Sequence, residues 1–260
     1  MNDLLSLRTA AAICSGTYHI QQDIACQDAV AVKKWPNGAC VVLCDGAGSC
    51  RYAREGAQCT VETVAALLEH KLACWLENSD APAAEELIAA CLQALSAAPW
   101  GIQEQSCTLL FAASDDRGHC LCGHIGDGYI FKVSSGDSTL LSDAENGDSP
   151  NETVFITALD AATHLRLYRG ILTGGESLIL CSDGAGDALY QKSEQQCATA
   201  VAKIGSWLTD IEETEVSNAL YRGMDQVFRQ VTPDDMSVAI LSAVKTDGVS
   251  EENTPNDMMS

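Results

Sequence analysis

Apolar positions along the chain fall into short runs typical of strands and longer stretches with helical spacing. From Ala53 to about Asn78 the apolar residues recur at helical intervals, which predicts an amphipathic helix. Asp80 followed by Pro82 is typical of a helix start, and a second helix is expected at Glu85–Leu95. The strands predicted before these helices are Leu7–Cys14, Ala25–Lys33 and Ala39–Cys44.

The second half of the chain repeats this order of strands followed by two helices. The predicted strands are Cys107–Ala113, His119–Ile125, Tyr129–Val133, Ser138–Leu141, Val154–Ala158, Thr163–Tyr168 and Ser177–Cys181. Helices are expected near Ser193–Leu208 and Glu212–Phe228, and a last strand at Ser237–Val244. The polar, acidic stretch Ser142–Thr153 is expected to be a loop, either facing a substrate or forming a plain surface excursion.

This order of elements does not alternate strand and helix as a parallel sheet requires. It favours two antiparallel sheets packed together, with a pair of helices outside each sheet. The sequence therefore predicts an α+β fold. We expect a single domain over residues 1–245 and an acidic, disordered tail over 246–260.

Aspartates stand at the ends of several apolar runs. Asp45 and Asp183 each end a run and precede a glycine, and Asp234 leads into the last strand. Asp127 lies in a Gly-Asp-Gly turn that is expected to be the tip of a hairpin. Any one of these is typical of a plain turn. Together they indicate carboxylates that converge on a hard cation such as magnesium or manganese.

These motifs occur in an order that resembles a known family. They are Cys26-Gln27-Asp28, Asp45-Gly46-Ala47-Gly48, Ser106-Cys107-Thr108-Leu109-Leu110, Gly126-Asp127-Gly128, Ser182-Asp183-Gly184 with Asp187, and Asp234-Asp235-Met236-Ser237. The chain resembles the metal-dependent protein phosphatases, the PPM or type 2C class, and most closely their short bacterial branch. The resemblance implies a four-layer α-β-β-α sandwich of two mainly antiparallel sheets flanked by helix pairs.

The resemblance also implies a function and a set of roles. The protein would be a serine/threonine phosphoprotein phosphatase that hydrolyses phosphate monoesters by attack of a hydroxide bridging two cations, manganese or magnesium. The residues implied as ligands of the two cations are Asp45, the Gly46 carbonyl, Asp183 and Asp234. Asp28 would orient metal-bound water, Asp127 and Asp187 would form a third cation site, and Asp235 would have a supporting role.

Two positions depart from the family pattern. Ala47 stands where many members have a histidine proposed to protonate the leaving group, and Asp23 stands where many have an arginine that grips the phosphate. His19, Arg51 and Arg54 are the candidates to replace these functions, and local structural roles for all three remain open.

The amino-acid composition limits which binding partners and which cellular compartment are expected. The net charge of −21, from 36 acidic and 15 basic residues, disfavours nucleic acid and anionic membranes as partners. The sequence shows neither a signal peptide nor an apolar run of the roughly 20 residues that span a bilayer. With 13 irregularly spaced cysteines, the cytoplasm is the expected compartment. The stretch from His119 to His124 is expected to be a buried strand with apolar cysteines rather than a zinc site.

Phosphoserine and phosphothreonine proteins are the expected substrates, and a partner kinase is expected to make them. Two alternatives stay open. The chain could be a catalytically weak or inactive signalling or scaffold module of the same fold, against which the retention of Asp45, Asp183 and Asp234 argues. It could also be a hydrolase of small phosphate esters, because a metal centre contacts only the phosphate group and does not distinguish what the phosphate is attached to.

Overall fold

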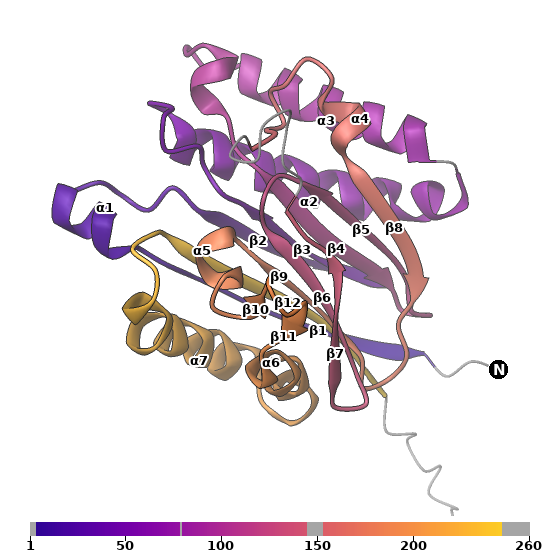
Figure 1. Cartoon of the computed structure of the whole chain (residues 1–260). Helices are drawn as coiled ribbons and strands as arrows, with labels where there is room; N and C mark the ends of the chain where they lie inside the picture. The colour runs from indigo at the N-terminus through magenta and orange to yellow at the C-terminus, as the bar shows by residue number, and fades with distance from the viewer. Residues whose placement is uncertain (1–3, 79, 145–152, 246–260) are drawn as a thin grey trace, which may run out of the picture.

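Two five-stranded antiparallel sheets lie face to face at the centre of the molecule (Figure 1). The computed structural model describes residues 4–78, 80–144 and 153–245. The first sheet contains, in spatial order, β1 (Leu5–Cys14), β12 (Met236–Lys245), β9 (Ser177–Cys181), β6 (Tyr129–Ser134) and β7 (Asp137–Ser142). The second contains β2 (Ala29–Trp35), β3 (Gly38–Cys44), β4 (Leu109–Asp115), β5 (His119–Ile125) and β8 (Arg166–Ile171).

Helices cover the outer face of each sheet. The second sheet packs against α2 (Ala53–Glu77) and α3 (Asp80–Ser96), and the first against α6 (Thr199–Asp210) and α7 (Glu213–Gln226) (Figure 1). The smaller elements are the helices α1 (Thr17–Gln22), α4 (Ala161–His164) and α5 (Asp183–Gly186), the 3-10 turns Ile102–Gln105 and Phe228–Gln230, and the hairpin β10 (Tyr190–Gln191) and β11 (Gln196–Cys197). The α+β class and the four-layer sandwich are confirmed.

Both faces of the central strands are buried. In β3, Val41 and Leu43 pack between the two sheets, whereas Val42 and Cys44 pack toward α2 and α3. The same alternation in β12 sends every second side chain toward α6 and α7. Because neither face meets water, these strands are continuous apolar runs rather than alternating ones.

The strand predicted at Val154–Ala158 is wrong. Among the described residues, the segment makes one backbone hydrogen bond to the strand region beside it, from the Ile156 N–H to the Cys107 carbonyl at 3.0 Å. The chain then turns, because the Ala158 N–H donates to the Phe155 carbonyl at 3.0 Å. The apolar side chains of the segment pack against the helix-covered face of the second sheet without adding a strand to it.

The hairpin expected at Gly126-Asp127-Gly128 is also wrong. β5 pairs with β4 and β8, whereas β6 pairs with β7 and β9, so the turn carries the chain from the second sheet to the first. Asp127 therefore lies at the junction of the two sheets.

Several further boundaries moved, among them the strand predicted from Ala25, which begins at Ala29. The helix predicted from Ser193 begins only at Thr199, because residues 196–197 pair with 190–191 in a small hairpin whose turn holds Gln195 at φ 51°. The strand predicted at Thr163–Tyr168 starts at Arg166, after the short helix α4. α1 was not predicted.

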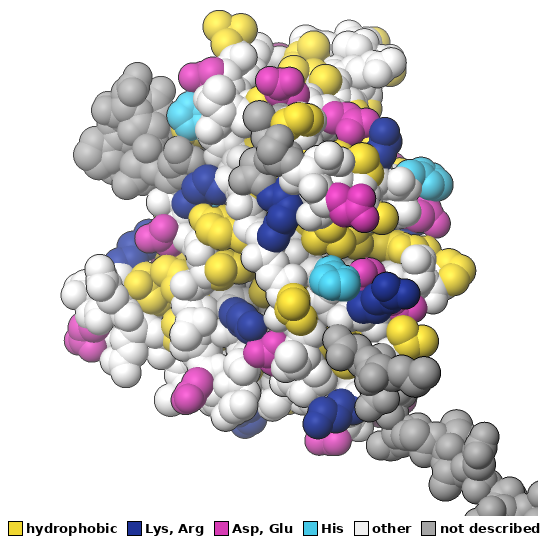
Figure 2. All heavy atoms as spheres, turned by 90° about the vertical axis from the view of Figure 1, so that its right-hand side faces the viewer, with side chains coloured by type: hydrophobic (Ala, Val, Ile, Leu, Met, Phe, Trp, Pro, Cys, Tyr) yellow, Lys and Arg dark blue, Asp and Glu magenta, His cyan; other side chains and the backbone are white. Residues whose placement is uncertain are grey.

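Part of the loop expected at Ser142–Thr153, residues 145–152, and the tail at 246–260 lie outside the described residues. No helix in the described ranges is long and apolar enough to cross a membrane. All 13 cysteines are free, and Cys120 and Cys122 are buried between the sheets as the apolar interpretation of that strand requires. Figure 2 shows basic side chains interspersed with acidic and apolar ones on the face it presents.

Candidate metal centre

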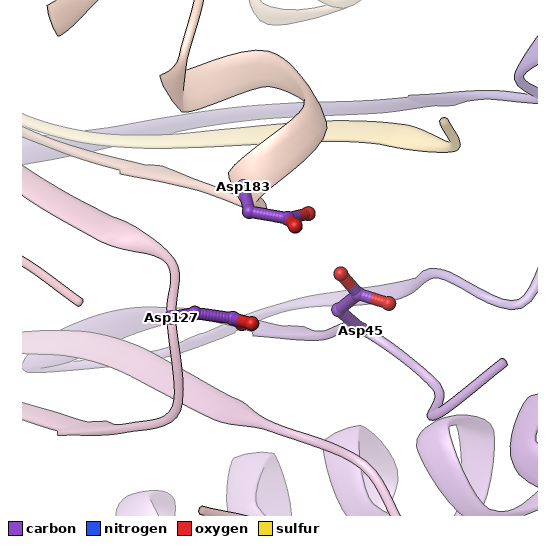
Figure 3. Close-up of side chains that lie close together, drawn as sticks. All are labelled: Asp45, Asp127 and Asp183. Atoms are coloured by element: carbon purple, nitrogen blue, oxygen red, sulfur yellow. The ribbon is translucent and has the colours of Figure 1, made fainter. Parts of the chain in front are cut away.

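Three carboxylates from distant parts of the chain meet at one end of the sandwich. Asp45 follows β3, Asp183 follows β9, and Asp127 lies in the turn from β5 to β6. One oxygen of each lies within 4.8 Å of the other two. Figure 3 shows the three side chains pointing toward one another across the junction of the sheets. Each sheet thus contributes one strand end, and the connection between the sheets contributes the third acid.

The turn at Asp45 is held against the segment before β4. The Asp45 N–H donates to the Thr108 hydroxyl at 2.9 Å, and the Thr108 N–H donates to the Asp45 carbonyl at 2.8 Å. Glycine is required next, because a Cβ on Gly46 would lie 2.8 Å from the Gln27 carbonyl oxygen. This close approach brings the segment that carries Asp28 beside the turn that carries Asp45.

The turn at Asp127 is equally constrained. Gly126 has φ +116°, a conformation that L side chains rarely adopt, and its Cβ would lie 2.5 Å from the Thr108 side chain. The Thr153 hydroxyl donates a hydrogen bond to the Asp127 carboxylate. Asp127 therefore holds a fixed position in the cluster.

The cluster carries uncompensated negative charge. Burial, followed by the charges of Asp28 and Asp183, raises the pKa of Asp45 well above its usual range. Burial and the Asp127 carboxylate raise the pKa of Asp183 to about 6. No Lys or Arg in the described part of the chain forms an ion pair with Asp45, Asp127 or Asp183. A set of crowded carboxylate oxygens without a basic partner fits a hard divalent cation.

Asp28, whose charge contributes to the raised pKa of Asp45, is only 3% exposed. Burial raises its pKa to about 7, although the nearby Ser237 and Ser182 hydroxyls favour the charged form. Neither hydroxyl is placed for a hydrogen bond, and both carboxylate oxygens lack a partner among the described residues. A buried carboxyl group without partners is costly, which also fits a site completed by a cation and its water.

Asp235 anchors the N-terminal segment to the start of β12. It is 3% exposed, and its carboxylate accepts the Gly16 N–H at 2.8 Å and the Gln27 N–H at 2.7 Å. The same carboxylate lies 2.7 Å from Nδ1 of His19. These contacts fit the supporting role expected for Asp235.

The cluster opens into a cavity of about 210 Å³. Five aspartates line it: Asp45, Asp127, Asp183, Asp234 and Asp235. Asp234 lies in the same cavity but outside the group of three, and its charge adds to the raised pKa of Asp183. Among the described lining residues there is no Lys or Arg, and the only histidine is His19.

Three sequence-predicted residues lie apart from this cavity. Asp187 accepts the Tyr129 hydroxyl at 2.5 Å and pairs with Lys192 at 3.3 Å. Arg51 and Arg54 are exposed at the start of α2, and the Arg51 guanidinium lies 5.4 Å from the centre of the Tyr52 ring. None of the three lines the cavity.

Other residues of the site were missed. Gln27, Thr108, Thr153 and Phe155 line the cavity, and the Gln27 Oε1 is buried without a partner in the described structure. Gln27 and Thr108 lie inside motifs used for the resemblance, but nothing in the sequence indicated which way their side chains point. Thr153 ends the polar loop, which was the one available signal for it.

Together with the family profile that matches the sequence, the fold and the acidic site place the chain in one class, the metal-dependent phosphatases. A sequence profile described as Protein phosphatase 2C matches residues 15–221, and the chain therefore belongs to the protein phosphatase 2C family. A search among curated proteins finds no match.

Solved structures with the same fold are distant in sequence. PppA, a key regulatory component of T6SS in Pseudomonas aeruginosa, is 16% identical with a TM-score of 0.62, over 93% of this chain and 100% of that one. The Mycobacterium tuberculosis serine/threonine phosphatase PstP/Ppp is 18% identical with a TM-score of 0.61, over 94% and 100%. The catalytic domain of PstP in complex with 2 manganese ions is 17% identical with a TM-score of 0.62, over 92% and 99%.

Proposed function

We propose that this chain is a divalent-cation-dependent phosphatase that hydrolyses phosphoserine and phosphothreonine in proteins. The observation that carries the proposal is the meeting of Asp45, Asp127 and Asp183, without a basic partner, in a protein phosphatase 2C fold. The manganese ions in the PstP catalytic domain support manganese as a cofactor, and magnesium is the expected alternative.

The residues proposed to hold two cations are Asp45, the Gly46 carbonyl, Asp183 and Asp234. Asp127 is proposed to serve a third cation beside them, together with Asp187, whose carboxylate would first leave Tyr129 and Lys192. When bound, the cations would activate a water molecule and neutralise charge on the phosphoryl group.

The rest of the site positions these groups. Asp28 is proposed to accept a hydrogen bond from the attacking water, because its oxygens lack any other partner in the described structure. Thr108 fixes the Asp45 turn, and Thr153 fixes Asp127. These hydrogen bonds hold the carboxylates close together before a cation binds.

The substrate is proposed to be a phosphoprotein rather than a small ester. The described lining of the cavity is mostly acidic, polar or small, and Phe155 is its one large apolar side chain, so it offers little to hold the organic part of a small ester and affinity would come from contacts outside it. A partner kinase is proposed to supply the phosphoprotein. The 13 free thiols support the cytoplasm as the proposed compartment.

A parallel titration with manganese and magnesium tests this function. We expect the protein to hydrolyse a phosphothreonine peptide and p-nitrophenyl phosphate when either metal is added, and neither substrate in EDTA. Hydrolysis of p-nitrophenyl phosphate but not of the peptide would instead support a hydrolase of small phosphate esters. A protein that binds manganese but turns over neither substrate would support an inactive module.

The matched variants are Asp45→Asn and Asp210→Asn. Asp45→Asn should lower kcat by at least about 100-fold while the protein stays folded, because even residues behind the ligands cost 10–100-fold. Asp210 is exposed at the end of α6, so Asp210→Asn should keep full activity. Near-wild-type kcat for Asp45→Asn at saturating manganese would show that the centre lies elsewhere.

A further inference from the structure

His19 is the only histidine in the described cavity lining, which holds no Lys or Arg, so its imidazole is the one nitrogen acid–base group there. The lining is otherwise acidic, and Ala47, which also lines it, offers no proton. Phosphate monoester cleavage leaves an alkoxide when the substrate is phosphoserine or phosphothreonine. This oxygen is strongly basic and needs a proton as the bond to phosphorus breaks.

His19 is held in one orientation at the cavity wall. Its side chain is nearly buried, and its Nδ1 lies 2.7 Å from the Asp235 carboxylate. Asp235 is itself fixed by the Gly16 and Gln27 N–H groups. The backbone of His19 is held as well, because its carbonyl accepts the Ile24 N–H at 2.9 Å. When a buried carboxylate accepts the Nδ1–H of an imidazole, Nε2 is the nitrogen left to exchange a proton with a substrate.

We propose that His19 is a catalytic residue that protonates the leaving oxygen through Nε2, and that Asp235 is the positioning residue that orients the ring. This inference rests on the proposed function. Water attacks phosphorus and releases one proton to solvent, and the bond between phosphorus and the ester oxygen breaks with its electron pair on that oxygen. The oxygen takes the proton from Nε2 to give the free alcohol, and His19 regains a proton from solvent.

The test compares two leaving groups in the variant His19→Asn. Asparagine can still donate an N–H to Asp235, so it keeps the contact but removes the acid. We expect kcat with a phosphothreonine peptide to fall about 100-fold or more, in the range typical of general acids. With p-nitrophenyl phosphate, whose leaving group needs no proton, kcat should fall less than about threefold.

The matched control is His119→Asn. His119 forms a similar pair with Asp115, 2.9 Å from Nδ1 to the carboxylate, but it is exposed and outside the cavity. This variant should keep wild-type rates with both substrates. Manganese binding by calorimetry should be the same in both histidine variants and the wild type, since neither side chain is proposed as a ligand.

Two further measurements address the pair directly. A low-field ring N–H proton resonance should be present in the metal-free wild type and in His119→Asn, and absent in His19→Asn and Asp235→Asn. In His19→Ala, added imidazole should restore peptide hydrolysis. This second variant keeps the proposal testable if His19→Asn does not fold.

Equal losses with both substrates, or no loss with the peptide, would overturn the inference while leaving the proposed function intact. Absence of the low-field resonance in the wild type would overturn the role of Asp235. A wild type that hydrolyses neither substrate with manganese would overturn the proposed function, and this inference with it.

Discussion

At the scale of single residues, the crowding of carboxylates makes the metal-free protein sensitive to pH. Burial raises the pKa of Asp28 to about 7 and that of Asp183 to about 6, whereas an aspartate in the unfolded chain has a pKa of about 3.9. The folded state therefore binds more protons than the unfolded state between these values. Stability is then greatest at acidic pH and falls as the pH rises from about 4 to about 7.

Thermal unfolding in EDTA checks this prediction. The melting temperature should fall across that window, and saturating manganese at pH 7 should reverse the fall. In Asp45→Asn one source of repulsion is removed, so its metal-free melting temperature at pH 7 should exceed that of the wild type. A melting temperature that rises from pH 4 to pH 7 in EDTA would show that ionising these buried carboxyl groups does not destabilise the metal-free protein.

Arg51 and Arg54 are exposed and do not line the cavity. We therefore expect Arg51→Ala and Arg54→Ala to raise KM for a phosphoprotein by about tenfold or less, the size of one charge-assisted hydrogen bond. Neither should change KM for p-nitrophenyl phosphate. An increase of KM for the small ester in either variant would show that the guanidinium reaches the phosphate itself.

The sequence alone identified the clustered aspartates but not the side chains that contact the site. Asp45, Asp127 and Asp183 were recognisable because each stands beside a glycine at the end of an apolar run. The contact between His19 and Asp235 joins residues 216 positions apart, and no local pattern encodes it. The direction of an exposed side chain such as Arg51 depends on the stacking of its neighbour Tyr52, which is also invisible in the sequence.

At the scale of elements, the turn after β3 depends on a glycine. A Cβ on Gly46 would lie 2.8 Å from the Gln27 carbonyl oxygen and 2.9 Å from the Ala53 backbone, so Gly46→Ala must push these segments apart. We expect a loss of stability of about 1–3 kcal/mol and weaker manganese binding, measured by urea unfolding and calorimetry.

The control is Gly223→Ala in α7. A Cβ there meets nothing within 4 Å, and alanine favours a helix by about 0.5–1 kcal/mol. This variant should be slightly more stable and bind manganese normally. Unchanged manganese affinity in Gly46→Ala would show that the turn tolerates the shift.

The strands were predicted well where burial on both faces leaves a long apolar run, as in β9 and β12. Val154–Ala158 is also mainly apolar, but within the described part of the chain it makes one backbone hydrogen bond to the segment beside it, and composition does not reveal pairing. The turn at Asp127 was mistaken for a hairpin because sequence shows two strands in succession and not the sheets to which they belong.

At the scale of the whole molecule, the proposed cations would clamp the two sheets together. Asp45 ends a strand of the second sheet, Asp183 ends a strand of the first, and Asp127 joins them. A cation that binds only the folded arrangement stabilises it by about 2.7 kcal/mol at 100 times its Kd. For a chain of this size, that corresponds to a rise in melting temperature of roughly 5–10 °C.

If cations link the two sheets, the protection from amide exchange should appear in both of them. Manganese should slow amide hydrogen exchange at the ends of both β3 and β9, because each end is fixed through its aspartate, while the far edge of the sandwich near β7 changes little. Asp183→Asn should lose the protection at β3 as well as at β9, since one missing ligand frees both sheets. Protection confined to a single sheet, or a melting temperature unmoved by manganese in a protein that manganese activates, would show that the cations bind one sheet without joining the two.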